Sequence, residues 1–416
     1  MTAVAGILNK QGVAIAADSA VTISGPQNRK VYNSANKIFT LSKYHPVGIV
    51  IYNNAQFMGV PWEIIIKEYR KKLKNKSFST LYEYKVDFFD WMKDNKFFIE
   101  EETDSFLFFD FLSFTQAMIN EFLKRKGQKD LQQDLPPFID DYISNEIPKH
   151  KKLDSLKSIN KNRTLSELKK FVPKILSILN ENLNTNFKPQ HIENKLVESY
   201  YAYLTHDQFL QFTGLIFIGF GNSEIFPRLY PINVSIVIDS NLRYKDDEEN
   251  SAIINNVNSS CIRPFAQTDV IDTILQGISP ELNYLSSRVF VNFIREFTDE
   301  IKLIKNMPTQ VLHHMENLKI DKYLEKYQNQ FNTVVKQRYV QPLMEAVSQL
   351  SKEDLAEMAE SLVYLTYLKR RFTMAEESVG GPVDIAVITK GDGFIWIKRK
   401  HYFDPKLNQS FFQKYF

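Results

Sequence analysis

Three residues near the start of the chain have the types and spacing needed for hydrolytic chemistry: Thr2, Asp18 and Lys37. Met1 precedes a small residue, so we expect its removal and a mature chain that begins with Thr2. A terminal threonine carries a hydroxyl and a free α-amine, and the amine, with a reference pKa near ~8, can accept the hydroxyl proton near neutral pH. A lysine close by favours the alkoxide form through its charge, and an aspartate keeps that lysine oriented. The pattern therefore predicts a nucleophilic threonine with two charged partners.

A plainer interpretation of the same residues stays open at this point. Met-Thr starts occur by chance, an aspartate such as Asp18 suits a turn at the end of a strand, and Lys37 suits a solvated surface. A retained Met1 would leave no free amine on Thr2.

The elements around these residues predict how they meet. Residues 3–8 form an apolar run that suits a strand buried on both faces, 9–12 are a turn signal, and 13–17 are a second apolar run. Residues 2–17 therefore predict a hairpin. A hairpin returns its second strand beside its first residue, which brings Asp18 close to Thr2. Lys37 opens a further short apolar segment at 38–39.

This stretch resembles the N-terminus of proteasome β-type subunits and of the bacterial ring peptidases similar to them, which are N-terminal-nucleophile hydrolases. The resemblance is carried by Thr2, by the segment Val-Ala-Ile-Ala-Ala-Asp-Ser-Ala-Val-Thr at 13–22, and by Asn-Lys-Ile at 36–38. It implies that Thr2 is the nucleophile and that Asp18 and Lys37 are its partners. Residues 377–397 resemble a second motif of the family, around Gly380 and Gly381.

The second motif also implies supporting residues, and here the chain departs from the family pattern. The family has an aspartate and a serine beside the paired glycines, and in ungapped register these become Glu376 and Val379. Ser378 lies one position away, so we predict Glu376, Ser378 and Gly380 as the supporting set. The family also has an oxyanion-binding glycine, whose equivalent falls near Val50 or Ile51.

The order of apolar and helical segments predicts an α+β fold, and the resemblance implies a four-layer αββα sandwich. The expected strand pairs lie at 2–17, 37–52, 213–238 and 383–397. We predict one proteasome-like domain over 1–416, built from 1–74, 206–280 and 351–400, with a helical insertion at 75–205 and a helical extension at 281–350. Three local signals add detail: Pro136-Pro137 as a break, Thr164 as a helix cap, and a capping box at Ser351.

Composition excludes several other classes of function. A net charge of +3 over 416 residues gives no case for nucleic-acid binding. The low glycine count of 14 and the lack of a nucleotide-binding fingerprint predict no nucleotide cofactor. His313 and His314 would point about 100° apart on a helix, which makes a poor metal pair, so no metal is expected. The single cysteine, Cys261, cannot form an internal disulfide, and no signal peptide or membrane span is visible, so we expect a cytoplasmic protein.

The expected function is a threonine-type peptidase that forms an acyl-enzyme on a polypeptide or amide substrate. Two alternatives stay open: a catalytically inactive proteasome-like scaffold or sensor subunit, and a hydrolase of non-peptide amides. The resemblance also implies self-association, for which a ring is one arrangement. It further implies an ATP-dependent unfoldase as a candidate partner.

Overall fold

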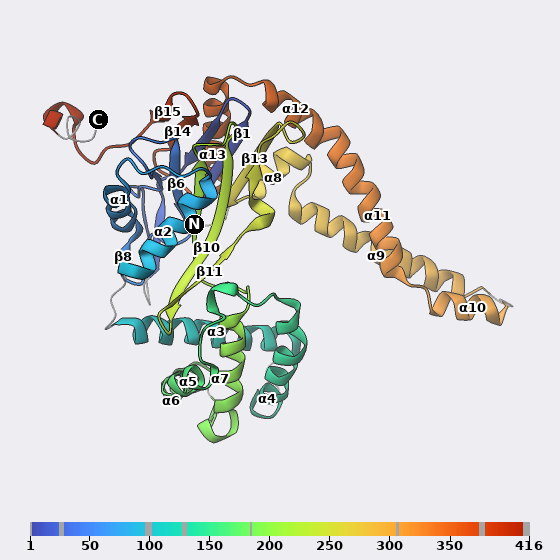
Figure 1. Cartoon of the computed structure of the whole chain (residues 1–416). Coiled ribbons are helices and arrows are strands. Elements are labelled where there is room, and N and C mark those ends of the chain that lie inside the picture. The colour runs from blue at the N-terminus through green and yellow to red at the C-terminus, as the bar shows by residue number, and fades with distance from the viewer. Residues whose placement is uncertain are drawn as a thin grey trace. The chain divides into compact units, whose positions relative to one another are not determined.

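The computed structural model describes residues 2–24, 29–95, 102–126, 131–183, 185–304, 308–373 and 379–410. Antiparallel sheets and helices both contribute, so the predicted α+β class is confirmed (Figure 1). The chain forms two compact units: unit 1 comprises Met1–Ala35 and Ile253–Phe416, and unit 2 comprises Asn36–Ala252. Their membership of one domain stays a prediction.

Unit 1 is built on a five-stranded antiparallel sheet with the order β13-β1-β2-β14-β15. The strands are β1 (Ala3–Asn9), β2 (Val13–Ala17), β13 (Ser260–Ala266), β14 (Asp384–Thr389) and β15 (Gly393–Lys398). The β1–β2 hairpin confirms the prediction for residues 2–17, with Val4 opposite Ala17. Every residue of β1 and β2 is buried, because both strands are central in the sheet and apolar on both faces. A two-stranded ribbon of β3 (Val21–Ser24) and β4 (Arg29–Tyr32) follows.

One face of this sheet is covered by α13 (Lys352–Phe372), which contacts β1, β2 and β14. The helix begins at the predicted capping box, in which Ser351 and Asp354 exchange hydrogen bonds. Its buried residues, among them Leu355 and Val363, join the small side chains of β1 and β2 in one apolar cluster. α8 (Asp269–Gln276) is attached to this helix because Asp269 pairs with Lys369 and Arg370.

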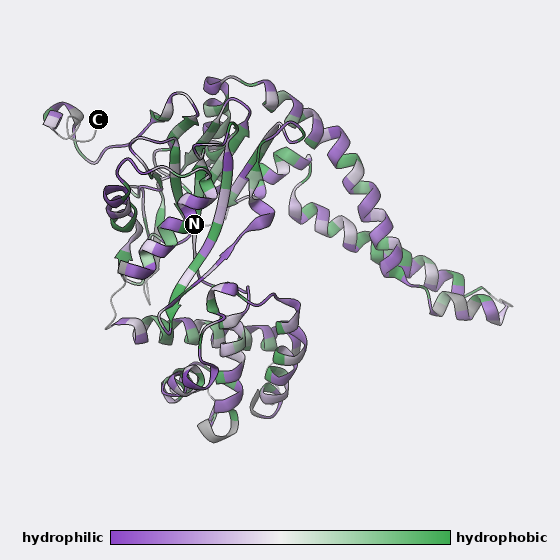
Figure 2. Ribbon diagram, in the orientation of Figure 1, coloured by the Kyte–Doolittle hydropathy of each residue, from purple (hydrophilic) through white to green (hydrophobic). Residues whose placement is uncertain are grey.

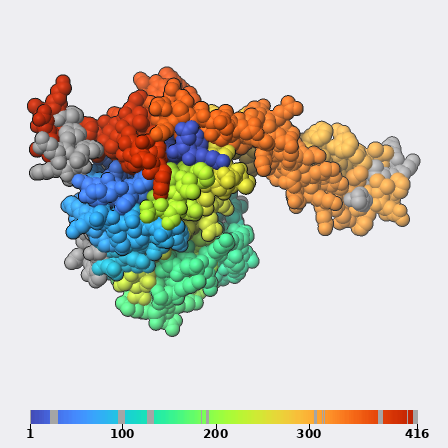
Figure 3. Space-filling model, turned by 45° about the horizontal axis from the view of Figure 1, so that its top comes forward, coloured from blue at the N-terminus to red at the C-terminus, as the bar shows by residue number. Residues whose placement is uncertain are grey.

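Residues 281–350 form further helices of unit 1, and their status as an extension stays a prediction. These helices are α9 (Pro280–Lys302), α10 (Thr309–Glu316), α11 (Ile320–Val335) and α12 (Gln341–Gln349). α9 and α11 lie side by side (Figure 1, Figure 3), and the ring of Phe290 stacks on that of Tyr327 with centroids 4.5 Å apart.

Unit 2 contains the second large sheet, with strand order β11-β10-β9-β6-β5. Its strands are β5 (Ile38–Thr40), β6 (Val47–Tyr52), β9 (Thr213–Gly219), β10 (Arg228–Ile238) and β11 (Asn241–Asp246), with the short β12 (Ala252–Ile253) beside β10. Figure 2 shows that the inner strands are largely apolar, which explains their burial. A small hairpin of β7 (Gln56–Phe57) and β8 (Val60–Pro61) leads into α1 (Trp62–Leu73), and α2 (Leu81–Asn95) packs on β9.

Residues 75–205 are mainly helical, and their status as an insertion stays a prediction. Besides α2, these residues form α3 (Thr103–Lys126), α4 (Leu131–Asp141), α5 (Lys161–Lys169), α6 (Val172–Leu183) and α7 (Pro189–Thr205). Two local predictions are wrong. Pro136 and Pro137 lie inside α4, because burial of the neighbouring Leu135 and Ile139 stabilises the helix despite two missing N–H donors. Thr164 lies inside α5, whose N-cap is Asn160. Among the described helices, none is both long and apolar enough to cross a membrane.

Candidate active site

Thr2 lies directly before β1 and is 4% exposed. Its carbonyl oxygen accepts a hydrogen bond of 3.1 Å from the amide of Gln267, which extends the pairing of β1 with β13 by one residue. The backbone of Thr2 is therefore held by the sheet, and its hydroxyl belongs to a residue with little solvent access.

Asp18 lies next to Thr2, as the hairpin predicts, and its carboxylate is held by three backbone amides. Oδ1 accepts from the amide of Ala3 at 2.9 Å, and the amide of Asp18 donates to the Ala3 carbonyl at 3.1 Å. Oδ2 accepts from the amides of Ala20 and Gly380, each at 3.1 Å. Since the peptide nitrogen of Ala3 is bonded to the carbonyl carbon of Thr2, the carboxylate is fixed beside the predicted nucleophile.

The paired glycines near the C-terminus complete this arrangement. The amide of Ser19 donates to the carbonyl of Gly380 at 3.1 Å, and its hydroxyl donates to the carbonyl of Pro382. Gly381 has φ +76°, and a Cβ there would lie 2.7 Å from Cβ of Asn33, so this position requires glycine. The two residues at 380–381 thus bring the C-terminal motif against the turn that carries Asp18.

The other predicted supporting residues are placed differently. Glu376 and Ser378 lie outside the described residues. Val379 is 2% exposed and belongs to the apolar cluster of unit 1, so its side chain contributes to packing where the family pattern has a hydroxyl.

Lys37 belongs to unit 2, where it directly precedes β5. It is 3% exposed, which argues against the solvated-surface interpretation. Its carbonyl accepts from the amide of Ile51 at 2.9 Å, so that amide is used within the sheet and is not available as an oxyanion donor. Asn53 follows β6 with φ +67°, a conformation that asparagine adopts more readily than most residues.

Sequence reasoning missed the part played by residues 33–35. No role was predicted for them from the sequence, but they follow the β3–β4 ribbon, and the amide of Ala35 donates to the carbonyl of Ser19 at 3.1 Å. Asn33 packs against Gly381. The alternation of apolar and polar residues in Val-Thr-Ile-Ser at 21–24 was the available signal for the first strand of this ribbon.

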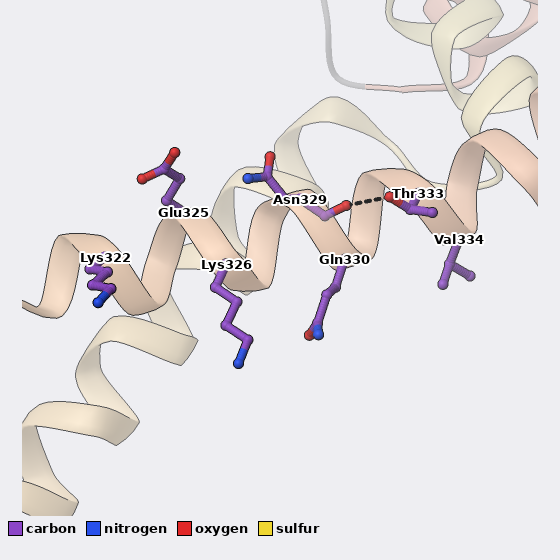
Figure 4. Close-up of a pocket in the computed structure, with 7 residues that line it drawn as sticks. All are labelled: Lys322, Glu325, Lys326, Asn329, Gln330, Thr333 and Val334. Carbon is purple, nitrogen blue, oxygen red and sulfur yellow. Dashed lines mark hydrogen bonds between the residues drawn. The ribbon is translucent and has the colours of Figure 1, made fainter.

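Alternative reactive groups receive less support from the structure. Burial raises the pKa of the Cys261 thiol, with the nearby Arg263 charge opposing it, so the reactive thiolate is disfavoured. Among the described residues, no group of three or more His, Cys, Asp or Glu side chains is arranged to hold a metal. A hollow of about 760 Å³ is lined by seven residues of α11 alone, and none of them is a predicted site residue (Figure 4).

Comparison with known proteins gives likenesses of structure only. No family model and no curated protein matches the sequence. Similar solved structures include Anbu from Hyphomicrobium sp. strain MC1, with 11% identity, a TM-score of 0.28, and coverage of 100% of this chain and 94% of that one. Anbu (ancestral beta-subunit) from Yersinia bercovieri has 8% identity and a TM-score of 0.27, covering 99% and 94%. The helical assembly of the Anbu complex from Pseudomonas aeruginosa has 9% identity and a TM-score of 0.27, covering 100% and 93%. Likenesses at this level do not assign the chain to a family.

Proposed function

We propose that this chain is an N-terminal threonine hydrolase of the proteasome-like type that cleaves amide bonds in polypeptides. The observation that carries the proposal is the hydrogen bond from the Ala3 amide to the Asp18 carboxylate, which fixes a charged partner beside Thr2. The proposal includes the four-layer αββα sandwich that is expected for this type of hydrolase. The strand orders of both sheets and the helices packed on each are compatible with it.

The reaction follows from the groups that a terminal Thr2 carries. Its α-amine takes the proton of its hydroxyl, and the oxygen attacks the substrate carbonyl carbon. The C–N bond then breaks, the departing amine leaves with that proton, and an ester to Thr2 remains. Water attacks the ester, the acid product leaves, and the hydroxyl regains a proton. Asp18 touches no reacting atom in this scheme and acts as a positioning residue.

The place of Lys37 beside Thr2 is part of the proposal. Chain connectivity supports it, because Ala35 is hydrogen-bonded to Ser19 and Lys37 follows two residues later, within roughly 8 Å of the Cα of Ala35. In that position its ammonium charge favours the alkoxide form of the threonine.

The second candidate is a catalytically inactive scaffold subunit. It is favoured by the apolar packing of Val379, since the family pattern supports the nucleophile's amine with a hydroxyl there. A retained Met1 would also favour it, because Thr2 would then have no free amine.

Intact-mass spectrometry separates these two candidates. We expect a mass that lacks the initiator methionine, and an added mass after treatment with a threonine-directed covalent inhibitor such as a peptide epoxyketone. Thr2→Ala protein, treated in parallel, is the control for labelling elsewhere. A terminal threonine that takes up no inhibitor would contradict the hydrolase and leave the scaffold.

The self-association expected for such a hydrolase is proposed to use α9. Five large apolar side chains, spaced by three or four residues, share one face of this helix and are between 42% and 66% exposed: Leu282, Leu285, Val289, Phe293 and Phe297. The helix contacts α11 through the face next to this stripe, where Phe290 stacks on Tyr327. A continuous apolar stripe of this size marks an interaction surface.

A second copy of the chain is the occupant that we propose for this stripe. The flank of α9 carries both Arg288 and Arg295 and both Glu296 and Asp299. Two antiparallel copies can therefore place opposite charges beside an apolar seam. We expect Phe293→Glu to lower the assembled mass measured by multi-angle light scattering at micromolar concentration.

The control for this experiment is Asn329→Glu, which adds the same charge to the exposed face of α11 (Figure 4). It should leave the assembled mass unchanged. A strictly monomeric unsubstituted protein, or equal effects of the two substitutions, would reject α9 as the interface.

A further inference from the structure

A small cavity in unit 2 has a carboxylate in its lining and aromatic rings around it. Its volume is about 130 Å³, and it lies where α3 meets the ends of β9 and β10. The residues that define its chemistry are Phe106, Phe109, Asp110, Gln211, Phe212 and Ser235. Since a water molecule takes about 30 Å³, the cavity has room for about four groups of that size.

Asp110 is the residue in this lining whose burial and hydrogen bonding favour a bound cation. It is 6% exposed, and buried carboxylates are rare unless a cation or several donors compensate them. The Tyr200 hydroxyl donates to its Oδ2 at 2.8 Å. That is the one hydrogen bond to this carboxylate from the part of the chain that the structure describes, so Oδ1 has no protein donor there.

Arg243 is the cation whose charge acts on Asp110. Arg243 is fully buried, but its guanidinium donates to backbone carbonyls, with Nε 2.7 Å from the oxygen of Leu204 and Nη2 3.0 Å from that of Tyr203. It forms no ion pair with Asp110 within the described ranges. Burial raises the pKa of the Asp110 carboxyl, and the charge of Arg243 and the bond from Tyr200 offset this only in part. A cation delivered into the cavity would meet a carboxyl group that Tyr200 and Arg243 compensate only in part.

The aromatic rings around the cavity favour an organic cation over a metal ion. Phe106, Phe109 and Phe212 line it, and the faces of aromatic rings attract alkylammonium groups better than strongly hydrated metal ions. Phe109 is 59% exposed although it is a large apolar side chain, which suits a ring that closes over a ligand. We infer that this cavity binds a small alkylammonium group of about the size of a lysine side-chain end.

The test uses the full chain and ligand-observed NMR or calorimetry at neutral pH, with butylammonium as the probe and 1-butanol as its neutral counterpart. Butylammonium should bind at least about tenfold more tightly, because only it can form a charge-assisted hydrogen bond with Asp110. Equal binding of the two probes, or no binding of butylammonium, would overturn the inference. Nα-acetyl-lysine methylamide identifies the source: if it binds as well as butylammonium, the natural ligand is a protein side chain, and if it is excluded, the ligand is a free amine.

Three variants connect this binding to the cavity. Asp110→Asn should weaken butylammonium binding about tenfold. Phe109→Ala removes an exposed ring and should weaken binding severalfold without unfolding the chain. Tyr44→Ala is its matched control, because Tyr44 is 67% exposed, lies in the same unit and does not line the cavity. Equal affinities of the Phe109 and Tyr44 variants would contradict the inference. Thr2→Ala should bind as the unsubstituted protein does, so this result stands apart from the proposed hydrolase.

Discussion

Thr2→Ala is expected to abolish amide hydrolysis while leaving the fold intact. Loss of a catalytic nucleophile typically lowers kcat by about 10⁴-fold to 10⁶-fold. The fold should persist because the sheet holds Thr2 through its backbone carbonyl and the Gln267 amide, and alanine keeps both groups. Thr2→Ser should retain measurable turnover, since it keeps a hydroxyl and an amine on the first residue. Turnover of a fluorogenic peptide panel, with circular dichroism for the fold, measures both.

The matched control is Thr389→Ala. Thr389 is also 4% exposed and lies at the other end of the same sheet, where its hydroxyl interacts with Asp392. Its loss should leave turnover unchanged.

Lys37→Ala should remove most of the activity, because the alkoxide form then loses its charge partner. Hydrolysis that survives Thr2→Ala at the original rate would refute the mechanism.

Asp18→Asn is expected to lower both stability and turnover. The carboxylate accepts from the amides of Ala3, Ala20 and Gly380, and an amide side chain offers one acceptor oxygen and an NH₂ group that cannot accept. At least one buried N–H would lose its partner, at a cost of about 1–3 kcal/mol for each. The C-terminal glycine segment would then lie less firmly against the site. Thermal unfolding and turnover per folded molecule are the two measurements.

A control substitution at Asp269, in the same unit, separates the effect of Asp18→Asn on turnover from its effect on stability. Asp269→Asn weakens the attachment of α8 to α13, since it disturbs the pairs with Lys369 and Arg370. It should lower the melting temperature without a matching loss of turnover per folded molecule. If both aspartate variants lose activity only in proportion to unfolding, Asp18 has a structural role alone.

The sequence determined the local elements and one part of the candidate site. The apolar runs around 9–12 predicted the hairpin, and the hairpin brought Asp18 to Thr2, because a short turn leaves two such strands one way to pair. The capping box at Ser351 was also readable, since its hydrogen bonds join residues three apart. The hairpin and the capping box depend on residues that are close in the sequence, so the local residue pattern predicts both.

The tertiary structure decided the contacts that join distant segments. The bond between Gly380 and Asp18 spans 362 residues, and no local pattern states which amide will meet that carboxylate. The burial of Val379 and the helix through Pro136-Pro137 depended in the same way on what packed against them. The sequence could name Asp110 only as one acidic residue in a helix, because the backbone carbonyls that Arg243 binds, in place of an ion pair with Asp110, follow from the packing. The local sequence allows several hydrogen-bond and packing partners for each of these residues. Tertiary packing determines which of these contacts form.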